Sequence, residues 1–433
     1  MDWSLYFFSS YPDVGEEAQA LAPTAKSCPP PPSSSSAPTL SLSADLDYAA
    51  IGMTYSLNWT SENANSCAAT GSWGGAKSTS GSQKFAADFV GEQVYNISCG
   101  NLSKSVTVTV LPEFTSIPDA RFEFSLVNLK IDDIIDGRAR TEKLLTVKDL
   151  WIESTPGDLY SASFFPNLAG GSWFGDYRIL PVTNFFSDLR TPFPNGGKIL
   201  DITGLENFRN LEVLSIATQN FTAINFKTFK KLKWLALSEI PLQSLDVSDL
   251  TELYFLGVTE TPLTTLDIAK LTKLTQLEIQ NLWPNTLPHT TKNGVRVPGM
   301  TNLDVSNQPN LLRLYCTLNR LTSLNLKNNT KLQELWASAN LFASVDLSGM
   351  SNLHYIIFNN SFELTDLNIK GVAGGGVPSR LYTEGSPKLF QIKVTSVQAI
   401  EARIAQITSN TPAGQTPALG LYWDSWTALV NAP

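Results

Sequence analysis

The chain has 433 residues, which is enough for two or three domains with substantial cores. Its formal net charge is −8, its 31 Lys and Arg residues are scattered without basic runs, and no window of 18 uninterrupted apolar residues occurs. We therefore predict neither nucleic-acid binding nor membrane insertion. Two histidines and four cysteines leave little for a metal or thiol enzyme, so we predict no cofactor and no metal site.

Residues 1–26 form an arm that is rich in aromatic side chains and has no basic residue before Lys26. A secretory signal needs a basic start and then an apolar run, so this arm, which carries Asp2, does not predict one. Its aromatic residues either anchor the chain to a partner protein or pack as a strand on the chain's own domain. They are Trp3, Tyr6, Phe7, Phe8 and Tyr11.

Residues 27–36, SCPPPPSSSS, predict a linker. Four prolines favour an extended polyproline II conformation, and the serines add flexibility. Cys28 is expected to be exposed, as an unpaired thiol rather than in an intermolecular disulfide.

Residues 37–112 predict a β-sandwich, because short runs of β-forming residues alternate with Gly, Ser and Asn turns. The alternation around Tyr95, Ile97 and Cys99 places Cys99 on the buried face of its strand. Cys67 lies 32 residues before Cys99. We pair the two, since a disulfide that closes such a loop stabilises a fold by about 3–4 kcal/mol.

The spacings W-x7-C and Y-x3-C in this region, formed by Trp59, Cys67, Tyr95 and Cys99, resemble those of bacterial and phage immunoglobulin-like modules. The tyrosine lies four residues before the second cysteine, where antibody domains have two, so the resemblance implies no antigen-type recognition. It implies a spacer or a weak surface binder.

The strongest pattern is a 21-residue repeat. Leu211, Leu232, Leu253 and Leu274 are each 21 residues apart, and Leu311, Leu332 and Leu353 repeat the interval. This period predicts a leucine-rich-repeat solenoid, a parallel β-sheet horseshoe whose leucines share one core. Within it we expect Cys316 to be buried, and Asn319 and Asn340 to bond to the loop backbone.

Residues 117–137, IPDARFEFSLVNLKIDDIIDG, resemble the amino-terminal cap of bacterial leucine-rich-repeat surface proteins. The helical spacing of Phe122, Leu126 and Leu129 would close one end of the core. A capping box at Thr395–Gln398 predicts a closing helix near the other end. The solenoid with its helical caps thus takes in residues 113–433, where Trp423 and Trp426 fold back onto that helix or contact a partner.

Three insertions interrupt the repeat and map to loops. One lies within 280–301 and holds Trp283, and the longest lies near 154–197 and holds Trp173. Both leave just after a strand on the same edge of the sheet, where they could together wall a binding surface. The third is a Gly-rich excursion around 371–384, inferred from the 36 residues between Leu353 and Leu389.

Aromatic side chains recur at 21-residue intervals on the face of the sheet that points away from the core. They serve either as a stabilising ladder across the strands or as a rigid platform for a partner or glycan. They are Trp234, Tyr254, Phe255, Tyr315, Trp336 and Tyr355.

No catalytic residues are predicted. His354 and His289 lie on a strand flank and in an insertion, away from any clear nucleophile. Asp132, Asp133 and Asp136 lack the spacing of a calcium loop. A glycosidase needs two carboxylates that face one cleft. Glu278 and Glu334 are expected on the same outward face of the sheet, where such charges usually serve solvation or partner contacts.

The sequence therefore predicts a multidomain, noncatalytic surface protein in which an immunoglobulin-like stalk carries the solenoid. Without a secretion signal, we expect a bacteriophage virion component, decorating the capsid or associated with the tail. The arm would bind other virion or surface proteins, and the solenoid a host-surface protein or glycan. The alternatives are a bacterial cell-surface adhesin, which would be extracellular, and a polysaccharide-degrading enzyme.

Overall fold

The computed structural model of the chain describes residues 37–153, 197–281, 299–375, 378–389, 391–395, 420–422 and 428–431. The aromatic arm, the linker with Cys28 and the expected closing helix beyond Thr395 lie outside these residues. So do the remaining side chains singled out above, which are Trp173, Trp283, His289, Trp423 and Trp426.

The first domain, here called the β domain, consists of two sheets with a shared core. One sheet has the order β1-β3-β6 and is antiparallel; the other has the order β2-β8-β7-β4-β5, and in it only β2 and β8 are parallel. Alternating burial along β3 and β7 places Leu57 and Ile97 in one core. The strands are β1 Thr39–Ala44, β2 Tyr48–Ala50, β3 Thr54–Glu62, β4 Cys67–Gly71, β5 Gly75–Lys77, β6 Ser80–Ala86, β7 Gly91–Cys99 and β8 Leu102–Leu111.

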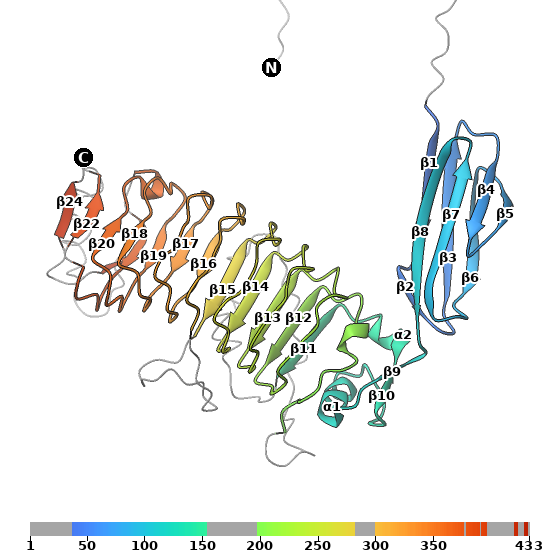
Figure 1. Cartoon of the computed structure of the whole chain (residues 1–433), viewed down its shortest axis with the longest axis horizontal. Helices are drawn as coiled ribbons and strands as arrows, with labels where there is room; N and C mark the ends of the chain where they lie inside the picture. Colours follow the sequence, from blue (N-terminus) through green and yellow to red (C-terminus); the bar gives the residue numbers. More distant parts are fainter. Residues whose placement is uncertain are drawn as a thin grey trace, which may run out of the picture.

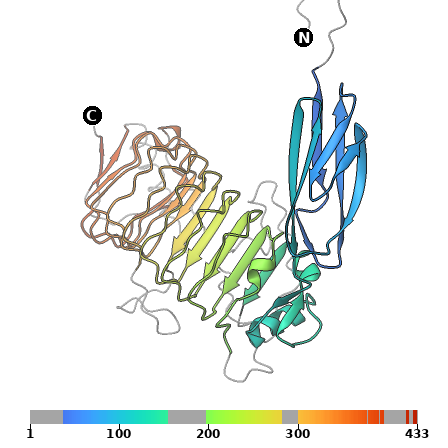
Figure 2. The ribbon, with the colours of Figure 1, turned by 45° about the vertical axis from the view of Figure 1, so that its right-hand side comes forward.

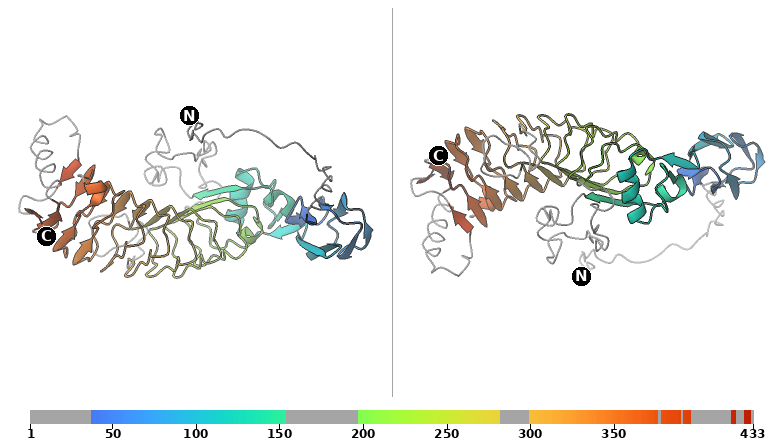
Figure 3. Two further views of the ribbon diagram at one scale, coloured as in Figure 1. Left: turned by 90° about the horizontal axis from the view of Figure 1, so that it is seen from above. Right: turned by 90° about the horizontal axis from the view of Figure 1, so that it is seen from below.

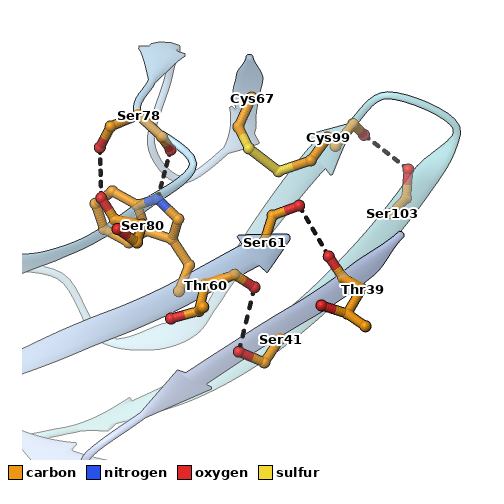
Figure 4. Close-up of a disulfide and its surroundings, with 11 residues drawn as sticks. Thr39, Ser41, Thr60, Ser61, Cys67, Ser78, Ser80, Cys99 and Ser103 are labelled. Atoms are coloured by element: carbon orange, nitrogen blue, oxygen red, sulfur yellow. Dashed lines mark hydrogen bonds between the residues drawn. A yellow bond between two sulfur atoms is a disulfide. The ribbon is translucent and has the colours of Figure 1, made fainter. Parts of the chain in front are cut away.

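A disulfide between Cys67 and Cys99 joins β4 to β7, where the two residues are register partners (Figure 4). Both cysteines are buried. Nearby, the indole Nε1 of Trp59 donates a hydrogen bond to the Ser78 carbonyl oxygen at 2.9 Å, and the Trp59 and Trp73 rings meet edge to face. The disulfide and the aromatic cluster therefore hold the same core together.

A short cap follows the β domain and covers one end of the solenoid. Strands β9 Phe114–Ser116 and β10 Arg138–Arg140 pair antiparallel, with helix α1 Ala120–Asn128 between them and helix α2 Thr141–Leu144 after them. Asp119 caps α1 by accepting hydrogen bonds from the backbone N–H groups of Arg121 and Phe122. Phe122 and Leu126 are fully buried in the solenoid core. Within the described ranges, no helix is long and apolar enough to cross a membrane.

The solenoid is organised around a ten-stranded parallel sheet, here called the long sheet (Figures 1 and 2). The 21-residue interval of the leucines appears directly in its register, since Leu214 pairs with Leu235 and Leu235 with Leu256. These leucines are 0% exposed because the repeats before and after each one stack on it, which a single repeat could not do alone. The leucine-rich-repeat solenoid predicted from the sequence is therefore present. Its first nine strands are β11 Asp149–Glu153, β12 Val213–Ala217, β13 Trp234–Ser238, β14 Phe255–Thr259, β15 Gln276–Gln280, β16 Arg313–Tyr315, β17 Glu334–Trp336, β19 Tyr355–Ile357 and β21 Arg380–Tyr382.

At the corners after β16 and β17, buried side-chain amides bind consecutive repeats together. Asn340 accepts a hydrogen bond from the backbone N–H of Leu321 and donates to the carbonyl oxygens of Cys316, Ala337 and Ser338. Asn319 makes the equivalent bonds one repeat earlier. Cys316 is fully buried, and burial raises the pKa of its thiol to about 12, so it is a packing residue.

The C-terminal repeats differ from the sequence prediction. Ile356 of β19 pairs with Leu381 of β21, so this repeat has 25 residues, and the excursion adds four residues to the period rather than fifteen. The 36-residue interval was misleading because Leu389 belongs to the next turn of the core and does not begin a strand of the long sheet. The long sheet ends with β23 Gly420–Tyr422.

A second parallel sheet accompanies these repeats (Figure 3). Its order is β18-β20-β22-β24, and all three pairings are parallel. The C-terminal repeats therefore carry strands on two sides of the solenoid. The four strands are β18 Ser344–Asp346, β20 Asp366–Asn368, β22 Gln391–Val394 and β24 Ala428–Asn431.

The β domain stands at an angle to the N-terminal end of the solenoid (Figure 1), and side chains of the two parts pack against each other at the junction. Ala50 and Leu111 of the β domain form a buried cluster with Leu145, which follows α2. Lys231 of the solenoid pairs with Asp47 of the β domain at 2.7 Å. The Arg209 guanidinium lies 5.6 Å from the centroid of the Tyr48 ring. Apolar, ionic and cation–π contacts thus all cross the junction.

Candidate binding face of the long sheet

The outward face of the long sheet carries two rows of side chains that alternate with the buried leucines. Because the strands are in register, residues of one row lie side by side on neighbouring strands. The first row over the C-terminal strands is Arg313, Glu334, Tyr355 and Arg380. The second row is Tyr315, Trp336, Ile357 and Tyr382.

Over β13 and β14 the predicted aromatic residues pack on each other. The rings of Trp234 and Phe255 are stacked, with centroids 3.6 Å apart and planes 8° apart, and Tyr254 meets Trp234 edge to face. Phe255 is only 1% exposed, although its strand position faces outward. The lack of a side chain at Gly257 makes room for this ring, since a Cβ there would lie 3.1 Å from two of its atoms. Phe255 is thus a packing residue that offers no contact surface.

Strand β15 places a buried carboxyl group in the middle of the outward face. Glu278 is 2% exposed, and burial raises its pKa to about 8. The Gln276 amide donates a hydrogen bond to its Oε1 at 2.5 Å, and its Oε2 has no hydrogen-bond partner within the described part of the chain. Nothing in the spacing of the sequence indicates this burial.

The part of the face over β16, β17, β19 and β21 is more open. We call Tyr315, Trp336, Tyr355 and Tyr382 the aromatic face. Trp336 is 38% exposed, and its ring lies against that of Tyr315 with centroids 4.9 Å apart. Among these four residues, only Tyr382 was absent from the sequence prediction, because the 25-residue repeat hid the register of β21.

Charged neighbours hold these rings in place. The Tyr315 hydroxyl donates to Oε2 of Glu334 at 2.7 Å, and Arg313 pairs with Oε1 of the same carboxylate at 3.3 Å. Burial and the Glu334 charge raise the pKa of Tyr315 well above its usual range, so the phenol remains a donor. The Arg380 guanidinium lies 5.6 Å from the Tyr355 ring centroid and donates to the Tyr382 hydroxyl. The arrangement is a rigid aromatic surface with satisfied polar groups.

The two carboxylates considered for a hydrolase, Glu278 and Glu334, are not arranged as an acid–base pair. Glu278 lies in the second row on β15 and Glu334 in the first row on β17, with β16 between them. Both oxygens of Glu334 are engaged by Arg313 and Tyr315. His354 is exposed on the flank of β19. Among the described residues, no group of three or more His, Cys, Asp or Glu side chains is placed to hold a metal ion.

No protein-family model matches the sequence, and the comparison with curated proteins finds no match. Among solved structures, the chain is similar to the functional domain of InlJ from Listeria monocytogenes, with 19% identity and a TM-score of 0.37 over 65% of this chain. This chain spans 57% of that structure's length. It is also similar to the internalin InlF from Listeria monocytogenes, with 16% identity and a TM-score of 0.32 over 65% of this chain and 90% of that one. The leucine-rich-repeat domain of APL1B matches 54% of this chain and 84% of its own length, with 17% identity and a TM-score of 0.24.

Proposed function

We propose that this chain is a noncatalytic binding protein that recognises a surface protein or glycan through the aromatic face. The observation that carries the proposal is the exposure of Trp336 within a set of rings that are already fixed by their neighbours. Large aromatic side chains dominate binding energies, and fixed rings lose little conformational entropy on binding. An exposed ring among fixed rings therefore favours a role in binding over a purely structural role as a ladder.

The rest of the sequence-predicted aromatic set has a supporting role in this proposal. Trp234 and Tyr254 are partly exposed beside the buried Phe255, and they extend the rigid surface toward the N-terminal repeats. Trp173 and Trp283 in the insertions remain proposed walls of the same surface. We propose no catalytic role for Glu278 or Glu334, since neither is positioned as a free acid or base.

We also infer that the β domain is an immunoglobulin-like module that occupies residues 37–112, with the solenoid and its caps in residues 113–433. The two-sheet arrangement and the Cys67–Cys99 disulfide support this assignment. In this proposal the module is a stalk, and the arm of residues 1–26 attaches the chain to a larger particle or surface.

For the setting of the protein, we propose a bacteriophage virion surface component, with a bacterial cell-surface adhesin as the alternative. Mass spectrometry of purified phage particles separates the two. Presence of the chain in the particles is the expected result. Its absence from particles, together with its presence on the bacterial surface, would favour the adhesin.

The binding proposal is tested with labelled full-length chain applied to intact bacterial cells and to a printed array of bacterial glycans. Binding to cells or array is expected, and Trp336→Ala should weaken it by at least about tenfold. Phe362→Ser is the matched control, because Phe362 is 58% exposed but lies outside the aromatic face. Equal binding by wild type and Trp336→Ala, or no binding at all, would contradict the proposal.

A further inference from the structure

The loop between α1 and β10, residues 129–137, holds two adjacent isoleucines in solvent. Ile134 is 60% exposed and Ile135 is 45% exposed. Single exposed apolar side chains are ordinary on protein surfaces, whereas contiguous apolar patches are candidates for interaction sites. The backbone contacts of the loop decide which description applies here.

Both ends of this loop are fixed to the cap. At its start, the Leu126 carbonyl oxygen accepts hydrogen bonds from the N–H groups of Ile131 at 2.9 Å and Asp132 at 3.2 Å. At its end, the carboxylate of Glu123 accepts hydrogen bonds from the N–H groups of Asp136, Gly137 and Arg138, at 2.9, 2.7 and 2.9 Å.

Glu123 is only 1% exposed, so a buried carboxylate holds this short segment in place. Burying a charge is costly unless it is well bonded, and here two of the three donors come from the loop and the third is Arg138 at the start of β10. The two isoleucines are thus held in solvent by a rigid frame, and their exposure does not arise from a loose loop.

Acidic side chains surround the two isoleucines. Asp132 and Asp133 precede them and Asp136 follows them, against the two basic residues Lys130 and Arg138, of which Arg138 pairs with Asp136 at 3.3 Å. Burial raises the pKa of Asp132, one of whose carboxylate oxygens is buried, so Asp133 and Asp136 supply most of the exposed negative charge. The loop therefore presents an apolar centre with a rim of net negative charge.

We propose that this loop, here called the isoleucine knob, docks into an apolar pocket with a basic rim on a partner protein. Burying the two side chains supplies the affinity, and the aspartates select lysine or arginine around the pocket. The knob lies on the N-terminal cap, whereas the aromatic face lies over β16 to β21 (Figure 1). It is therefore a second interaction surface, and it does not depend on the function proposed above.

The test uses two synthetic amphipathic peptides, one of leucine and lysine and one of leucine and glutamate, with the full-length chain labelled at its isoleucine methyl groups. NMR titration then reports the site, and isothermal titration calorimetry reports the Kd, which can also be measured for variants without these isoleucines. We expect the lysine peptide to shift the Ile134 and Ile135 signals saturably, and the glutamate peptide to leave them unchanged.

Three variants separate the knob from general attraction to an acidic protein. Ile134→Ser with Ile135→Ser, which keeps every charge, should raise the Kd at least about tenfold. Asp132→Asn with Asp133→Asn should also raise it, and Phe362→Ser should not change it. An unchanged Kd in the isoleucine variant, shifts confined to other sites, or no binding of the lysine peptide would overturn the proposal.

Discussion

At the residue scale, the burial of Glu278 distinguishes this solenoid face from a simple row of surface residues. A carboxyl group at an outward strand position normally remains ionised in water. Here it is 2% exposed, and burial raises its pKa to about 8. At neutral pH the group is mostly protonated, so the centre of the face is less negative than the sequence suggests.

The buried carboxyl predicts a specific pH dependence of stability. The pKa of Glu278 is about 8 in the folded chain and near the ordinary 4.5 when unfolded, so the folded state binds more protons between these values. Stability should therefore fall as pH rises from about 5 to 9. Glu278→Gln should remove part of this fall, on the order of a few kcal/mol, in urea unfolding at the two pH values.

Glu363→Gln provides the matched control. Glu363 is half exposed and pairs with Lys388 on the surface, so removing its charge should leave the slope between pH 5 and 9 unchanged. If Glu278→Gln and Glu363→Gln show the wild-type slope alike, Glu278 is ionised in the folded chain and the account of the central face is wrong.

At the scale of the repeat, Asn340 joins one turn of the solenoid to the previous one through two hydrogen bonds, with Leu321 and Cys316, and makes two more within its own turn. Asn340→Ala leaves the buried N–H of Leu321 without its acceptor, which should cost about 1–3 kcal/mol. Asn352→Ala removes one exposed hydrogen bond to Thr330 and should cost less than about 1 kcal/mol. Equal losses in chemical denaturation of the two variants would refute a specific role for the buried amide.

The sequence allows the repeat to be predicted where its leucines are kept, and it fails where they change. Leu314 and Leu335 could be placed in the core from their 21-residue spacing alone. Strand β21 was missed because Pro378 stands where earlier repeats have the leucine that precedes the strand. Leu389 was mistaken for that leucine instead. The sequence pattern therefore does not predict the strands of the long sheet beyond β19.

For the candidate site, the sequence predicted the positions of the side chains but not their exposure. The register of the repeat put Tyr315, Trp336 and Tyr355 on one face, but it gave no measure of exposure. The burial of Phe255 depends on the missing side chain at Gly257 and on stacking with Trp234, which no periodicity reports. The Arg313–Glu334 pair spans one 21-residue repeat, so charge pairing at that interval would have revealed it.

At the scale of the whole molecule, the packed junction should hold the β domain at a fixed angle to the solenoid. Only Pro112 and Glu113 separate β8 from β9, and the buried cluster around Leu145 joins the β domain to the cap. Small-angle X-ray scattering of residues 37–433 should therefore fit a single conformation. A stalk that tumbles freely would instead require an ensemble.

Leu145→Asp tests which contacts set this angle. An aspartate in the Ala50–Leu111–Leu145 cluster buries an unpaired charge, so the two domains should separate and the radius of gyration should rise. Leu341→Asp, at a side chain that is 40% exposed on the solenoid, should leave the scattering unchanged. Identical scattering from wild type and Leu145→Asp would show that the cluster does not hold the junction.

The central claim is that the solenoid binds its target through the aromatic face. Hydrogen exchange of the full-length chain, measured with and without the cell-surface target found in the binding assay, tests it most directly. Binding should slow exchange in β16, β17, β19 and β21 and leave the β domain unchanged. Protection confined to the β domain or to the second sheet, with none over Trp336, would contradict the account.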